Sequence, residues 1–261
     1  MRQLVSSTLE GMPGEIYSSI LVVLVIFIIC LIVYIKAKRT DPLQKPKGII
    51  HLAELLVSTI DGMVKNYMGP GLSFLGSYFT AIAMYLFIGF IFGLLGLPTP
   101  ITYYMVPFLL GLTSFIMIHA TAIYYQRWKY FKRYTAPVAF FLPINMVTMW
   151  SPLLSLSFRL FGNALSGWVL MAIVYNALQG LSAAIFSFLP AGLNTVFIAP
   201  LVASWLHLYF DLIAAFIQTM VFLTLSMIFI GQEVPYELIE SKQTATNGER
   251  VKENEYASTV S

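Results

Sequence analysis

The fold is decided by one charged residue inside an apolar run, in the stretch Ser155-Leu156-Ser157-Phe158-Arg159-Leu160-Phe161-Gly162-Asn163. Between Pro137 and Gln179, Arg159 is the only charged residue. A guanidinium stays protonated at ordinary pH, so it cannot avoid burial by losing its charge. Placing it at membrane depth costs at least ~2.5–3.5 kcal/mol. We therefore expect a chain that keeps Arg159 there to use it.

The composition indicates an integral membrane protein. Hydrophobic residues make up 58% of the chain and charged residues 10%, whereas soluble domains carry about 25% charged residues. Long apolar runs predict spanning helices, and the alternating pattern of an outer-membrane barrel is not found. The net charge of +3 gives no indication of a nucleic-acid partner. The single cysteine, Cys30, lies in an apolar run, which excludes a disulfide framework and a cysteine metal site; we expect no metal and no cofactor.

The pattern predicts an all-α fold in a single membrane domain covering residues 1–261. One amphipathic helix at 51–68 is expected to lie at the membrane surface. Five spanning helices are expected at 17–35, 74–97, 101–125, 137–179 and 195–230. Basic residues follow the first and third spans: Lys36, Lys38, Arg39, Lys45 and Lys47, then Arg127, Lys129, Lys132 and Arg133. By the positive-inside rule these clusters are cytoplasmic, so the N-terminal segment 1–16 lies outside and the tail 231–261 lies inside.

The last two apolar runs are too long for ordinary spans. The run of about forty residues around Arg159 would extend ~60 Å as a helix, twice the ~30 Å hydrocarbon core. Each run either folds into two short spans or forms one steeply tilted helix. No cluster of polar turn residues lies near Pro152, Gly162 or Asp211. We therefore expect two long, steep helices, joined outside by the loop at Leu189-Pro190-Ala191-Gly192 into an antiparallel hairpin.

Polar residues form a stripe on each of these helices. Residues on the first share a face with Arg159 at helical spacing: Asn145, Ser155 and Asn163. The second helix carries its own stripe: His207, Asp211 and Gln218. One interpretation is an internal Arg159–Asp211 ion pair that holds two helices together, and the other is an ion or proton pathway. A transporter with a midplane Arg159–Asp211 site and a structural scaffold also remain open, whereas hydrolase and zinc-protease motifs are not found.

Two motifs resemble one known family. The first is Leu156-Ser157-Phe158-Arg159-Leu160-Phe161-Gly162-Asn163 followed by Gly167, and the second runs from His207-Leu208-Tyr209-Phe210-Asp211 to Gln218. Both resemble the signatures of subunit a of the F-type, proton-translocating ATP synthase, in its bacterial form. The resemblance covers most of the chain.

This resemblance implies a non-catalytic stator in a bacterial plasma membrane. Its expected partners are a ring of c subunits, the b-subunit peripheral stalk, other ATP synthase subunits and the lipid bilayer. Two half-channels would carry protons to and from the ring carboxylates and couple the proton gradient to rotation and ATP synthesis. The residues implied in proton translocation are Arg159, Asn163, His207, Asp211 and Gln218, with Asn145 and Ser155 as candidates for the cytoplasmic half-channel. Trp168 and Asn145 depart from the family pattern, since many members carry ionisable residues there.

Overall fold

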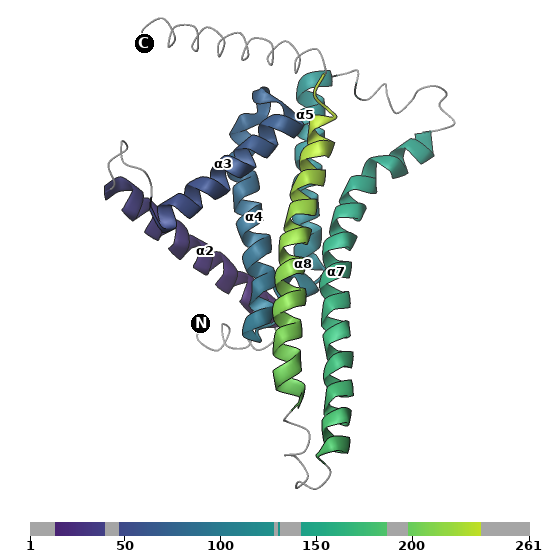
Figure 1. Cartoon of the computed structure of the whole chain (residues 1–261). Coiled ribbons are helices and arrows are strands. Elements are labelled where there is room, and N and C mark those ends of the chain that lie inside the picture. Colours follow the sequence, from purple (N-terminus) through teal and green to yellow (C-terminus); the bar gives the residue numbers. More distant parts are fainter. Residues whose placement is uncertain (1–13, 40–46, 128–129, 131–141, 187–197, 236–261) are drawn as a thin grey trace, which may run out of the picture. The chain divides into compact units, whose positions relative to one another are not determined.

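The protein is described here by a computed structural model covering residues 14–39, 47–127, 130, 142–186 and 198–235, and every regular element in these ranges is a helix (Figure 1). In chain order the elements are α2 (Gly14–Arg39), α3 (Ile49–Met68), η1 (Pro70–Leu75), α4 (Gly76–Ile91), η2 (Phe92–Leu95), η3 (Pro100–Thr102), α5 (Met105–Gln126), α7 (Leu142–Ile185) and α8 (Ile198–Gly231). The all-α prediction is confirmed for this part of the chain.

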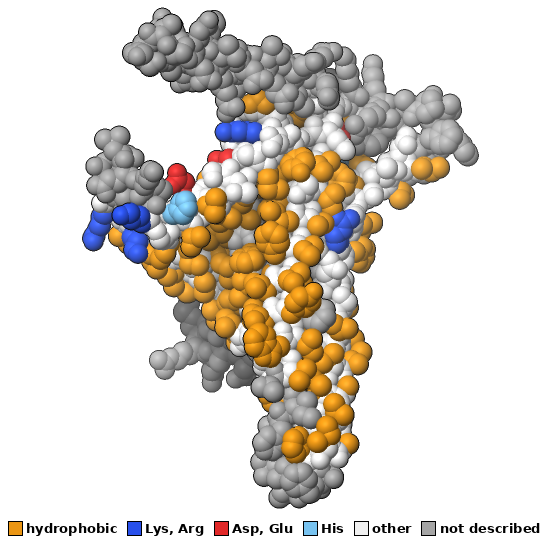
Figure 2. All heavy atoms as spheres, viewed as in Figure 1, with side chains coloured by type: hydrophobic (Ala, Val, Ile, Leu, Met, Phe, Trp, Pro, Cys, Tyr) orange, Lys and Arg blue, Asp and Glu red, His pale blue; other side chains and the backbone are white. Residues whose placement is uncertain are grey.

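Within the described residues, five helices are long and apolar enough to cross a membrane, which confirms the predicted number of spans. They are Gly14–Arg39, Pro70–Leu95, Met105–Gln126, Val147–Ile185 and Val202–Gly231. Figure 2 shows hydrophobic side chains over much of the visible helical surface. Three basic residues, Lys36, Lys38 and Arg39, lie in the last turn of α2. The chain is therefore a multi-pass membrane protein.

The two long apolar runs are each one helix. α7 has 44 residues and α8 has 34, so they are ~66 Å and ~51 Å long. Pro152 lies inside α7 without ending it. The alternative in which each run folds into two short spans is therefore wrong. The expected outer loop at 189–192 lies outside the described residues. Residues 1–13, the tail from 236 and several of the basic residues also lie outside them. The orientation of the chain across the membrane therefore stays a prediction.

The chain forms two compact units, and most of the long helices contribute to both. The first contains Met1–Leu31, Ala83–Leu109 and Ser157–Val221, and the second contains Ile32–Ile82, Leu110–Leu156 and Phe222–Ser261. In the first unit α7 and α8 run side by side in opposite directions, as expected of a hairpin (Figure 1). Tyr104 packs its ring on Phe158 and Phe161 of α7, at centroid distances of 5.6 and 5.4 Å.

The second unit is held by α3 and by polar contacts to α8. Gln126 at the end of α5 donates a hydrogen bond to the Glu233 carboxylate, with 2.8 Å between Nε2 and Oε2. Ser114 and Ser226 share a buried hydrogen bond of 3.2 Å between their hydroxyl oxygens. His119 places its Nδ1 3.0 Å from the Phe115 carbonyl oxygen, one turn earlier in α5.

α3 is amphipathic in the way the sequence predicts. Its buried side chains are Ile60, Val64 and Met68, and Leu52 and Leu55 are exposed. Exposed leucines on a helix with polar neighbours suit the boundary between water and lipid. The position of α3 at that boundary stays a prediction.

A close backbone contact joins α3 to the end of α8. A Cβ added at Gly231 would lie 2.2 Å from the Tyr67 carbonyl oxygen and 3.3 Å from the Met68 Cα. Neither atom can rotate away, because both belong to the main chain. Only glycine fits at this position without displacing α3.

We expect Gly231→Ala to lower the free energy of unfolding by about 1–3 kcal/mol, because the added methyl overpacks a backbone contact. Gly62→Ala on α3 is the matched control, since a Cβ there meets nothing within 4 Å. That substitution should be neutral or add about 0.5–1 kcal/mol through helix propensity. Thermal unfolding in detergent, followed by circular dichroism, measures both. Equal midpoints for the two variants would contradict the proposed contact.

Candidate functional site

The site is built on the part of α7 that belongs to the first unit, residues 157–185. Leu160 and Ala164 recur at helical spacing and are buried, which fixes the face that α7 turns inward. Arg159 is half-buried beside this face, and Asn163, one turn later, is exposed. Helical geometry therefore places both polar side chains at the edge of the packed face.

Asn163 contacts α8 through Gln218. The Asn163 Nδ2 donates a hydrogen bond to the Gln218 Oε1. Gln218 is only 4% exposed, and its own Nε2 is buried without a hydrogen-bond partner among the described residues. A buried donor without a partner costs about 1–3 kcal/mol, and such groups are commonly satisfied by an ordered water. The free amide donor therefore points to a hydrated position next to the Asn163–Gln218 contact.

His207 and Asp211 form a pair on one face of α8. The His207 Nδ1 lies 2.8 Å from the Asp211 Oδ2, and the two side chains are 28% and 22% exposed. Their four-residue spacing brings them together within a single helix. The Tyr175 ring of α7 lies beside His207, with 5.7 Å between the ring centroids. An imidazole that is hydrogen-bonded to a carboxylate is a common arrangement for proton transfer.

The contacts of Asn163 with Gln218 and of Tyr175 with His207 set the register of the antiparallel helices. In this register Asp211 lies level with Leu170. Leu170 is about eleven residues beyond Arg159, or ~16 Å along the α7 axis. The register therefore disfavours an internal ion pair between Arg159 and Asp211.

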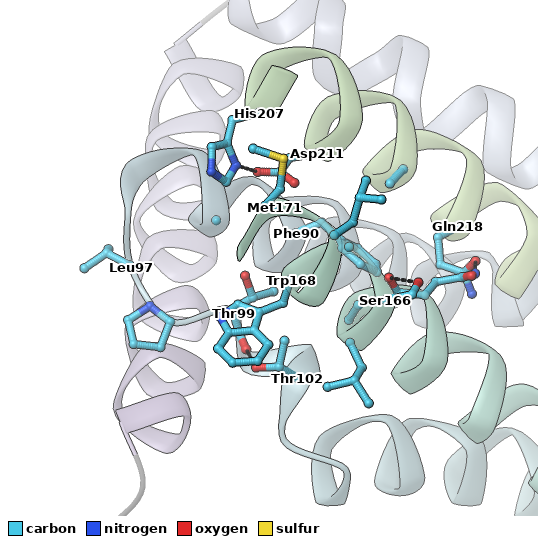
Figure 3. A pocket seen from close by; sticks show the side chains of 18 of the residues that line it. Phe90, Leu97, Thr99, Thr102, Ser166, Trp168, Met171, His207, Asp211 and Gln218 are labelled. Atoms are coloured by element: carbon cyan, nitrogen blue, oxygen red, sulfur yellow. Dashed lines mark hydrogen bonds and ion pairs between the residues drawn. The ribbon is translucent and has the colours of Figure 1, made fainter. Parts of the chain in front are cut away.

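A pocket of about 960 Å³ lies in the first unit, against α7 and α8 (Figure 3). Four segments contribute its polar lining: Glu15 of α2, Thr99 and Thr102 before α5, Asn163 and Ser166 of α7, and His207, Asp211 and Gln218 of α8. No lysine or arginine of the described part of the chain lines it. The lining of the pocket thus includes both the His207–Asp211 pair and the Asn163–Gln218 contact.

The turn before α5 brings a hydroxyl close to Asp211. Gly96 has φ +71°, a left-handed conformation that favours glycine and ends η2. A Cβ added at Gly93 would lie 3.1 Å from the Thr99 Oγ1 and 3.4 Å from the Asp211 Oδ2. The distance between the Thr99 Oγ1 and the Asp211 Oδ2 therefore cannot exceed the sum of these two values. One or two water molecules can bridge such a gap.

The structure brings most of the predicted site residues into one unit. Those in the first unit are Arg159, Asn163, His207, Asp211 and Gln218, and all but Arg159 line the pocket. Asn145 and Ser155 lie on the part of α7 that belongs to the second unit, and both are half-buried. The functional roles of all seven stay predictions.

Other pocket residues were not identified from the sequence. They are Glu15, Thr99, Thr102 and Ser166. Thr99 and Thr102 lie in a proline-rich turn, and Glu15 lies in the first turn of α2. Residues of these types are common at such positions for structural reasons, so the sequence alone did not mark them as functional. Trp168, noted as a departure from the family pattern, lines the pocket, is 66% exposed and points towards Thr99 and Thr102 (Figure 3). Within the described ranges no group of three or more His, Cys, Asp or Glu could hold a metal ion.

Comparisons with known proteins give consistent results. The chain matches the family described as ATP synthase A chain over residues 16–231. It is 27% identical over 250 residues to ATP synthase subunit a of Mycoplasmoides gallisepticum, covering 89% of this chain and 84% of that protein. The subunit a of Mycoplasma pneumoniae is 28% identical, with 88% and 82% covered. That of Mycoplasma genitalium is 31% identical, with 82% and 77% covered.

Adjacent alanines of α8 test whether the pocket holds water. Ala214 is exposed and lines the pocket, whereas Ala215 is fully buried. In a Cys30→Ser background, we expect Ala214→Cys to react with a hydrophilic thiol reagent about tenfold faster than Ala215→Cys, because only a hydrated thiol forms the reactive thiolate readily. Labelling rates in membrane vesicles provide the measurement. Equal rates would show that the pocket is closed to water.

Proposed function

Because this chain belongs to the ATP synthase A chain family, we propose that it is the stator subunit of an ATP synthase membrane sector, carrying protons to and from the carboxylates of a neighbouring c-subunit ring. The observation that carries this proposal is Arg159, which is half-buried and is the one charged residue of α7. The pocket includes Asn163, which lies one helical turn from Arg159. A permanent charge next to a water-accessible path is the arrangement expected of an ion pathway.

The exposed face of α7 suits a rotating apolar partner. In the first unit it presents Leu165, Val169 and Ile173, which are each four residues apart. Gly162 also faces open space, and a Cβ there would meet nothing within 4 Å. A helix of the ring can slide along such a surface because nothing on it interlocks with a fixed partner. Lipid would cover the parts that the ring does not.

Arg159 acts in this proposal as a fixed positive charge. An arginine cannot relay protons, because it does not deprotonate. It therefore blocks a direct leak between the two half-channels. Its charge favours the ionised form of a ring carboxylate that passes close to it. Each elementary charge that crosses at 100 mV contributes ~2.3 kcal/mol, so several crossings are needed for each ATP formed.

The pocket is our candidate for the outer half-channel. Protons would reach the His207–Asp211 pair first and then move through water to the Asn163–Gln218 contact. Asn163 lies one helical turn from Arg159, so this polar path ends where a ring carboxylate would be received. The unpartnered Nε2 of Gln218 supports a water position at that end of the path.

This outer path takes both of its ionisable relay groups from α8. Many family members carry an ionisable residue where this chain has Trp168, and the α7 wall of the pocket contributes amide, hydroxyl and indole groups instead. The His207–Asp211 hydrogen bond provides a proton donor and acceptor without help from α7. We infer that in this chain the His207–Asp211 pair of α8 takes the place of a proton relay that other family members divide between α7 and α8.

For the inner half-channel we propose Asn145 and Ser155. Both lie on α7 before Arg159, at positions that share a helical face with it. Neither carries a charge, so protons leaving the ring would pass along water molecules oriented by these polar groups. Their half-burial is compatible with contact to such waters.

The remaining parts of the proposal concern assembly. We propose that the protein binds the c-subunit ring, the b-subunit stalk and further ATP synthase subunits, and that ATP is formed by those other subunits. It would lie in a bacterial plasma membrane with its N-terminus outside and its C-terminus in the cytoplasm. The basic end of α2 supports this orientation.

Two alternative functions make different demands on the chain. A secondary transporter would place its substrate at helices broken near the membrane centre, whereas α7 and α8 are each continuous in the described residues. A structural scaffold would keep its function without Arg159. The scaffold is therefore tested by removing that residue.

We expect Arg159→Ala to abolish proton-driven ATP synthesis, because the fixed charge is needed to release a proton from each ring carboxylate. Synthesis is measured in vesicles that contain the assembled complex, together with passive proton conductance. Arg39→Ala is the matched control, since Arg39 is exposed at the end of α2. It should synthesise ATP at the wild-type rate. Normal synthesis by Arg159→Ala in a normally assembled complex would refute the proposed function.

A further inference from the structure

We propose that Glu15 is a proton-collecting carboxylate at the mouth of the pocket, from which protons pass to the His207–Asp211 pair. This inference rests on the proposed function, because it extends the outer path by one residue. Glu15 lies in the first turn of α2, is half-buried and lines the pocket. It belongs to the first unit together with the rest of the pocket lining.

The start of α2 packs on the turn that contributes the pocket threonines. A Cβ added at Gly14 would lie 3.6 Å from the Cγ of Pro98. Pro98 directly precedes Thr99, and both line the pocket with Glu15. Gly14 and Pro98 are therefore close together, which places the first turn of α2 beside the pocket wall.

Thr99 links this position to the known ionisable pair. Its hydroxyl and the Asp211 carboxylate both approach Gly93, at 3.1 and 3.4 Å from the position of a Cβ there. Pro98 approaches the first turn of α2, and the next residue, Thr99, approaches Asp211, so we place Thr99 between Glu15 and Asp211. Water molecules between them would complete a hydrogen-bonded path, and a hydroxyl can both donate to and accept from such waters.

The charges that line the pocket favour such a role. Its titratable side chains are Glu15 from α2 and His207 and Asp211 from α8; the turn before α5 and the α7 wall contribute none. Two carboxyl side chains and no lysine or arginine line the pocket, so acidic groups outnumber permanent cations there. A cleft lined by one sign of charge raises the local concentration of the opposite ion and its rate of arrival.

An acidic residue in a first turn also has an ordinary structural use. It interacts favourably with the helix dipole, and this effect alone would explain Glu15. A dipole role affects the stability of α2 but does not make the transport rate depend on outside proton concentration. The pH dependence of transport therefore separates the two explanations.

The test uses the full ATP synthase in vesicles, with ATP synthesis measured against the pH of the compartment from which protons enter, at constant total driving force. We expect Glu15→Gln to lower the rate about tenfold at high pH, where protons are scarce and collection limits the rate. At low pH the rate should approach that of the wild type, because protons reach Asp211 without a collector. Glu15→Asp should restore the high-pH rate, since it returns the carboxylate.

Glu54→Gln is the matched control, because Glu54 is exposed on α3 and does not line the pocket. It should match the wild type at every pH. A Glu15→Gln variant that matches the wild type throughout, or that is slowed by one factor at all pH values, would overturn the inference. If Asp211→Asn is slow in the same assay, the proposed function stands and Glu15 alone is excluded. If Arg159→Ala also synthesises ATP normally, the proposed function itself fails.

Discussion

The cost of keeping a guanidinium on an apolar helix is the constraint on which the site depends. Arg159 cannot become neutral, so α7 has to give it a position that is half-buried and close to polar groups. The buried Leu160 and Ala164 hold the helix on one side, and Asn163 brings an amide one turn away. The Oε1 of Gln218 on α8 then accepts a hydrogen bond from this Asn163 amide. The continuity of α7 through this region also keeps its backbone groups hydrogen-bonded, whereas a break near Arg159 would expose them to lipid.

The polar groups are graded along the helices rather than gathered at one point. Ionisable side chains lie at the His207–Asp211 end of the pocket, and neutral amides lie at the end nearer to Arg159. A carboxylate beside Arg159 would form a lasting ion pair, and a lasting pair would hold the charge in place. The separation of about eleven residues, or ~16 Å, between the levels of Asp211 and Arg159 avoids this pairing. The His207–Asp211 pair and Arg159 therefore occupy different levels along α7 and α8.

Sequence patterns predicted the helices better than the pocket. Five spans and the unbroken α7 and α8 followed from hydrophobic length, and Arg159, Asn163, Asp211 and Gln218 stood out because polar residues are rare in apolar runs. Glu15, Thr99 and Thr102 could not be recognised, since acids at helix starts and threonines in turns are common. The register of α7 against α8 depends on side-chain packing between helices, such as that of Tyr175 on His207. Helical periodicity within one sequence segment does not contain that information.

The two hydrogen bonds in the pocket differ in the elements that they join. The His207–Asp211 bond joins residues four apart in α8, so its length is set by the helix itself. The Asn163–Gln218 bond joins two helices and lasts only while they keep their register. A rotor pressing on α7 would shift it against α8 and stretch the second bond while leaving the first intact. The proposed relay pair would thus keep its hydrogen bond under mechanical load, and the Asn163–Gln218 contact next to Arg159 would be the one that responds to it.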